Sequence, residues 1–103
     1  MSGSNGPPRR FRVNRTAAVS ARIEELFREA EETGRSIPFA KALKRILTTL
    51  RTRPREFGES LFAFHHARLQ VRLGIDGPAS VRFAVHETAY EVVILSVDLL
   101  APG

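Results

Sequence analysis

The hydrophobic period of this chain changes at Gly58, and that change constrains the fold more than any other feature. Before Gly58 apolar residues recur every three or four positions, as on an α-helix that rests on a core. After it they alternate with polar residues, as on a strand with one covered face. A chain of 103 residues is long enough for one modest core and too short for two. The sequence therefore predicts one domain of the α+β class.

The first helix is predicted by an apolar stripe with spacings of four, four and three residues: Val19, Ile23, Phe27 and Ala30. Thr16 or Asn14 is suited to cap its start, because a side-chain oxygen there can accept a first-turn N–H. Gly34 is suited to end it, since glycine adopts the left-handed conformation of a helix terminus without steric cost.

The second helix is predicted to begin at Ser36 as N-cap, with Pro38 in its first turn, where a missing N–H costs little. Its apolar stripe has offsets of 0, 4, 7, 8 and 11: Phe39, Leu43, Ile46, Leu47 and Leu50. Pro54 ends the helix or follows its end. The short link at residues 34–36 predicts that the two helices pack as an antiparallel hairpin.

Four strands are expected. Phe11–Val13 is a short first strand, and Leu69–Ile75 and Val81–Val85 alternate apolar and polar residues around the turn at residues 76–78. Val92–Val97 is nearly continuous and β-branched, which predicts a central strand buried on both faces. The expected fold is a helical hairpin on a small, mainly antiparallel four-stranded sheet, in the order strand, helix, helix, strand, strand, strand.

Composition limits the function classes. The chain has no cysteine, which excludes a disulfide scaffold and a thiolate metal site and suits a reducing compartment. It has no long apolar run that could span a membrane. Met1 to Pro8 is rich in Gly, Ser and Pro and is expected to be a disordered tail without a secretory signal, followed by one domain over residues 9–103. A cytoplasmic location is therefore expected.

The net charge of +5 is unevenly distributed along the chain. Residues 35–55 include seven basic residues and no acid. Such a run favours an anionic partner, either nucleic acid or an acidic protein segment, although a solvated helix face would have the same composition. Lys44 and Arg45 are the candidate contacts on the second helix.

Two stretches carry a resemblance to a known family. One is residues 50–58, LRTRPREFG, at the end of the second helix. The other is residues 81–87, VRFAVHE, followed by the strand at residues 92–97. Over residues 11–99 the chain resembles the RelE/ParE superfamily of bacterial toxins, also described as plasmid-stabilisation proteins. The resemblance implies a type II toxin–antitoxin pair and a cognate antitoxin partner. It implies either ribosome-dependent cleavage of messenger RNA without a metal or, in ParE-like members, inhibition of DNA gyrase.

The resemblance also implies a role for Arg82, which matches the family's sheet arginine that stabilises phosphate charge. The chain departs from the family pattern after its last strand. Active RelE-like nucleases often carry an arginine there and a tyrosine or histidine further on, whereas residues 97–103 read VDLLAPG. This departure favours the alternative of a non-enzymatic binder on the same fold, either ParE-like or binding only a partner protein.

Metal-free RNA cleavage requires a base, an acid and cations that hold the phosphorane charge. By strand alternation four polar residues are expected to share the solvent face of the sheet: Arg68, Arg72, Arg82 and His86. His86 would then be the base, Arg82 would stabilise phosphate, and Arg68 and Arg72 would position RNA. Polar residues on the outer face of a half-buried sheet are equally expected without any function. No metal site and no cofactor are predicted.

Overall fold

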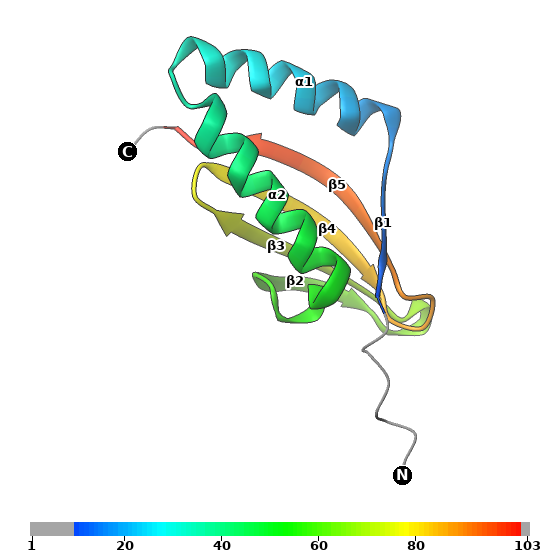
Figure 1. Cartoon of the computed structure of the whole chain (residues 1–103). Coiled ribbons are helices and arrows are strands. Elements are labelled where there is room, and N and C mark those ends of the chain that lie inside the picture. Colours follow the sequence, from blue (N-terminus) through cyan, green and yellow to red (C-terminus); the bar gives the residue numbers. More distant parts are fainter. Residues whose placement is uncertain (1–9, 102–103) are drawn as a thin grey trace.

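In the computed structural model, which describes residues 10–101, two helices lie on one face of a five-stranded sheet (Figure 1). The elements are β1 (Arg12–Arg15), α1 (Ala17–Glu32), α2 (Ser36–Thr52), β2 (Glu59–Phe64), β3 (Leu69–Asp76), β4 (Ala79–His86) and β5 (Glu91–Leu99), with short 3₁₀ turns η2 (Pro54–Glu56) and η3 (His65–Ala67). The α+β class is confirmed. The expected tail at Met1 to Pro8 lies outside the described residues.

The helix boundaries follow the predicted signals closely. Thr16 caps α1, because its hydroxyl accepts a hydrogen bond of 3.2 Å from the Val19 N–H. Gly34 follows the helix with a φ of +69°, as expected for a residue in the left-handed region. For α2 the N-cap position is Arg35 rather than Ser36, which is the first helical residue, and Pro54 follows the helix end as the start of η2.

The sheet differs from the prediction in the number and direction of its strands. Its order is β1-β5-β4-β3-β2, so β2 is a fifth strand at one edge and the expected count of four is wrong. Neighbours from β5 to β2 are antiparallel, whereas β1 runs parallel to β5. The mixed direction has a topological cause, since the helical hairpin and strands β2, β3 and β4 separate β1 from β5 along the chain.

One hydrophobic core lies between the helices and the sheet. The stripes of α1 and α2 meet the residues of β4 and β5 that point toward them: Val19, Leu26, Ala30, Phe39, Ala42, Ile46, Leu50, Ala79, Val81, Phe83, Val85, Val92, Ile94 and Val97. The burial of β5 alternates along the strand instead of extending to both faces, so the expectation of a doubly buried strand is wrong. The helices cover one side of β5 only.

The orientation of β3 is also opposite to the prediction. Arg72 pairs with Phe83, and Leu73 pairs with Arg82. Because directly opposed residues point to the same face, Phe83 places Arg72 on the helix side, and Leu73 points to the open face. The apolar residues of β3 therefore lie on the face that no described element covers: Leu69, Val71, Leu73 and Ile75.

Phe57 explains this reversal. Its ring stacks on the core residue Phe83 with centroids 5.9 Å apart, and it lies against Gly74, where a Cβ would overlap it. The helix side of β3 is thus occupied by the segment that follows α2. A small residue at position 74 and the stem of Arg72 border that segment, in place of large apolar side chains.

Candidate binding surface

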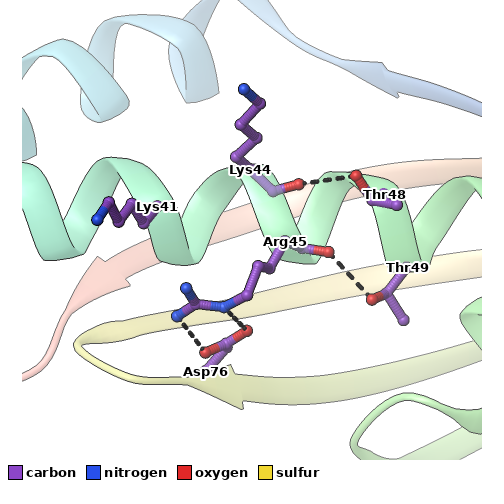
Figure 2. A pocket seen from close by; sticks show the side chains of 6 residues that line it. All are labelled: Lys41, Lys44, Arg45, Thr48, Thr49 and Asp76. Atoms are coloured by element: carbon purple, nitrogen blue, oxygen red, sulfur yellow. Dashed lines mark hydrogen bonds and ion pairs between the residues drawn. The ribbon is translucent and has the colours of Figure 1, made fainter.

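A cationic surface lies where α2 passes the turn between β3 and β4. Its pocket is lined by Lys41, Lys44, Arg45, Thr48, Thr49 and Asp76. In Figure 2 Arg45 reaches down toward Asp76, whereas Lys44 extends to the opposite side of the helix. Both threonine hydroxyls donate to carbonyl groups one turn earlier, at 3.1 Å and 3.0 Å, so they are bonded within the helix. The charge of this surface comes from the two lysines and the arginine.

Arg45 forms a bidentate pair with Asp76. Its Nε donates to Oδ2 at 2.9 Å, and its Nη2 donates to Oδ1 at 2.8 Å. Hydrogen bonding to Arg45 lowers the pKa of the Asp76 carboxyl and raises the pKa of the guanidinium, so both groups stay charged. Lys41 and Lys44 have no ion pair within residues 10–101. Of the two residues predicted on this helix, Lys44 is free to meet an anion, and Arg45 is already neutralised.

This pairing predicts opposite effects of two substitutions on polyanion binding. Asp76→Asn releases Arg45 from its ion pair, so the variant is expected to elute from immobilised heparin at a higher salt concentration than the wild type. The slope of log affinity against log salt concentration is expected to grow by the contribution of about one cation. Lys44→Ala is expected to elute at a lower salt concentration than the wild type, by a similar difference. Earlier elution of the Asp76→Asn variant would contradict the assignment of Arg45 as a neutralised cation. The helical circular dichroism of both variants serves as the folding control.

Beside the cationic surface, an apolar groove of about 270 Å³ runs between the two helices. Ile23 and Phe27 of α1 form one wall, and Leu43 and Leu47 of α2 form the other. Its floor is the sheet, at Val81, Ile94 and Val97. Arg15 and Lys44 also line the groove, so its rim carries cations. A segment with apolar side chains and flanking acids would be complementary to it.

The four residues predicted to share the solvent face of the sheet are not brought together. Only Arg82 and His86 lie on the open face, where their strand partners are Leu73 and Leu69. Arg72 lies on the helix side, and Arg68 lies outside the strands at the end of η3 with a φ of +54°. The prediction failed because β3 turns its polar residues toward the helix layer.

Arg72 is the largest correction. Its side chain is only 9% exposed. Its Nε donates to the Phe57 carbonyl at 2.9 Å, its Nη2 to the Gly58 carbonyl at 2.8 Å, and its Nη1 to Gln70 at 2.9 Å. These bonds attach the segment before β2 to β3. Arg72 therefore holds this segment in place and does not lie on the solvent face on which an RNA contact was predicted.

His86 is also engaged locally. Its Nδ1 accepts a hydrogen bond of 3.2 Å from the Ala89 N–H, which fixes the turn between β4 and β5. Arg82 lies four residues away on the same strand, about 13 Å along it at the rise of an antiparallel strand. Arg82 itself is exposed and has no ion pair within residues 10–101.

The remaining polar groups add no metal centre. No three histidine, aspartate or glutamate side chains within residues 10–101 lie close enough to hold an ion. His65 and His66 lie on η3, an exposed turn. Tyr90 packs against the core, its ring 5.1 Å from that of Phe11. None of the helices described between residues 10 and 101 is long and apolar enough to cross a membrane.

No known protein-family model, no curated protein and no solved structure matches this chain.

Two features of the binding surface were not predicted from the sequence. One is the groove between the helices, because the spacings of Ile23, Phe27, Leu43 and Leu47 predict only that these residues face the core. The other is the ion pair of Arg45 with Asp76, whose partners are 31 positions apart.

Proposed function

We propose that this protein is the toxin-like member of a bacterial type II toxin–antitoxin pair and that it acts in the cytoplasm by binding partners rather than by cleaving RNA. The order of its elements, with a helical hairpin before an antiparallel meander, supports the RelE/ParE-like assignment. So do the residues at positions 50–58 and 81–87 that resemble this family.

The groove between α1 and α2 is the observation that carries this proposal. It presents half-buried apolar side chains, including Ile23 and Leu43, between cations at Arg15 and Lys44. Its charge and shape fit an amphipathic, acidic segment of a cognate antitoxin, whose apolar side chains would replace water in the groove. Lys41, on the neighbouring cationic surface, would meet the acidic side chains of that segment.

The geometry of the sheet favours binding over catalysis. The turn occupies Nδ1 of His86, and Arg72 is held by backbone carbonyls. Arg82 lies on the open face and has no ion pair within residues 10–101, so it is the residue of the predicted set best placed to meet a phosphate group. A single arginine can hold a phosphate group but supplies neither the base nor the acid that RNA cleavage requires.

Ribosome-dependent messenger RNA cleavage is the second candidate, and exposed Arg82 is the observation that favours it. The two functions differ in what Arg82→Ala does during induced expression in a bacterial host. For a binder that targets DNA gyrase, growth arrest accompanies altered DNA supercoiling and persists in the Arg82→Ala strain. Arrest with rapid loss of translation, relieved by Arg82→Ala, would instead establish the ribonuclease.

The antitoxin site predicts a sharp difference between two positions on α2. Leu43→Glu places a carboxylate in the apolar groove and is expected to weaken binding of the proposed antitoxin, taken as the product of the gene next to this protein's own, at least about tenfold. Ile37→Glu is the matched control, because Ile37 is 67% exposed on the same helix and does not line the groove. Isothermal titration calorimetry with the purified partner measures both.

Equal affinities of the wild type and Leu43→Glu for the partner would contradict the proposal that the groove is the antitoxin-binding site. The melting temperatures of both variants must be compared with that of the wild type, because Leu43 is packed against the core. A variant that keeps its melting temperature and loses the partner isolates the binding role.

A further inference from the structure

The structure joins two basic segments that are far apart in the sequence. Residues 10–15 contain three arginines and no acid, and residues 35–55 contain seven basic residues and no acid. The Phe11 N–H donates a hydrogen bond of 2.9 Å to the Arg51 carbonyl. The start of β1 is thereby held beside the end of α2, and Figure 1 shows both at the same end of the sheet. Arg10 therefore lies close to the arginines at the end of α2.

Along α2 the cations without an ion pair lie on one side of the helix. Lys41, Lys44 and Arg51 are separated by three and seven residues, spacings that place them on the same side. All three are exposed. The stretch from Lys41 to Arg51 covers about 15 Å of helix. Together with exposed arginines at the end of the helix they form a basic strip, which consists of Arg10, Lys41, Lys44, Arg51 and Arg53.

The charges of the basic strip are not neutralised within the part of the chain that the structure describes. None of its five side chains makes an ion pair within residues 10–101. The glutamates of the helix layer lie on α1, which has five, whereas α2 has none. One cation in the last turn of a helix is stabilising, because it complements the helix dipole. Further cations close by repel one another and lower the stability of the fold. An anionic partner would remove this cost.

We propose that the basic strip binds the phosphate backbone of double-stranded nucleic acid, independently of base sequence. A duplex carries one negative charge per about 1.7 Å of its axis, a denser array of anions than an acidic protein segment offers. The planar guanidinium of arginine can donate to two phosphate oxygens at once. Sites for single strands stack the bases on exposed aromatic side chains. The basic strip has no such side chain, since the neighbouring Phe11 is buried. A duplex is therefore the better fit.

Fluorescence anisotropy tests the proposal, with a labelled DNA duplex of about 20 base pairs titrated with the purified full chain. The dissociation constant is expected near about 10 μM at about 0.1 M salt, within the range of sequence-independent binding. Five cations predict that log affinity falls against log salt concentration with a slope of about −4.5. A second duplex of the same length and unrelated sequence is expected to bind equally well.

A charge reversal within the strip is compared with one outside it. Arg51→Glu is expected to raise the dissociation constant at least about tenfold, because it replaces a cation of the strip by an anion. Arg28→Glu is the matched control, since it makes the same change of net charge at an exposed position of α1. Its effect is expected to stay within about twofold. Arg51→Lys keeps the charge and is also expected to bind within about twofold of the wild type, which separates loss of charge from loss of folding.

Three results would overturn the proposal. Equal losses of affinity in Arg51→Glu and Arg28→Glu would show that binding follows the net charge alone and needs no strip. Tighter binding of the single strand than of the duplex would exclude the duplex as the partner. Displacement of the labelled duplex by polyglutamate at a lower concentration of charge than by unlabelled duplex would make the strip a site for an acidic protein segment.

This inference does not depend on the antitoxin groove. Lys44 belongs to both surfaces, but Arg51 does not line the groove. Arg51→Glu is therefore expected to leave the affinity for the proposed antitoxin unchanged. The DNA titration needs no partner protein, so its outcome is the same whether or not an antitoxin binds the groove. Failure of one proposal can be told from failure of the other by these two measurements.

Discussion

Gly58→Ala is expected to lower the free energy of unfolding by about 3 kcal/mol, because it combines backbone strain with overpacking. Gly58 has a φ of +71°, in the region that alanine adopts only at a cost. An added Cβ would also overlap the backbone of β3 at the carbonyl group of Leu73 and the Cα of Gly74. Backbone atoms of a paired strand cannot move aside as a flexible side chain can, so the approach of β2 to β3 would have to open.

Gly34→Ala is the matched control for this prediction. Gly34 has a similar φ of +69°, but an added Cβ there would meet nothing within 4 Å. Its substitution is expected to cost only the strain, about 1 kcal/mol. Urea denaturation followed by circular dichroism measures both variants, and the difference between them isolates the close approach of the two strands. Equal losses of unfolding free energy in the two variants would show that the close approach of β2 to β3 does not restrict the residue at position 58.

Arg72→Met is expected to lower the free energy of unfolding by about 1–2 kcal/mol, because it leaves two partly buried carbonyl groups without their charged donor. Methionine keeps the length of the side chain and much of its packing, so the loss is assigned mainly to the hydrogen bonds. The carbonyls belong to Phe57 and Gly58, which lead into β2. Local opening of β2, seen as faster amide hydrogen exchange at this edge, should accompany the loss.

Arg82→Met is the matched control, because Arg82 is exposed on the next strand. Its substitution is expected to change the unfolding free energy by less than about 0.5 kcal/mol. Heparin binding is expected to show the reverse order, with a loss for Arg82→Met and little change for Arg72→Met at temperatures where it is folded. Weaker heparin binding of Arg72→Met without a loss of stability would contradict the structural role. Arg72 would then be a surface contact, as the alternation of apolar and polar residues in its strand predicts.

Much of the fold was predictable from local patterns. The stripes at Val19 to Ala30 and at Phe39 to Leu50 correctly predicted two helices, and the signals at Thr16, Gly34 and Pro54 lie at or next to their ends. Three of the four strands of the meander, β3, β4 and β5, were also predicted at nearly their observed positions. These features depend on residues within a few positions of one another, which is why a pattern in the chain is sufficient.

The candidate site was predicted less well, because its residues come from different elements. Lys44 lies on the exposed part of α2 as expected, and Arg82 and His86 share the open face. Arg68 and Arg72 do not lie on the open face. The alternation of apolar and polar residues in β3 does not indicate which of the two sets faces the helices. The register with β4 decides the face, and Phe83 opposite Arg72 places the arginine toward the helices.

The sequence by itself determined the class of the fold, the approximate helix ends, three strands of the meander and the concentration of positive charge along α2. The tertiary structure alone decided the parallel addition of β1 to β5, the fifth strand at the exposed edge, the orientation of β3 and the neutralisation of Arg45 by Asp76. The physical reason is the range of the forces involved. Propensity, capping and hydrophobic period act between near neighbours, whereas register, edge position and ion pairing arise only when distant segments share one core.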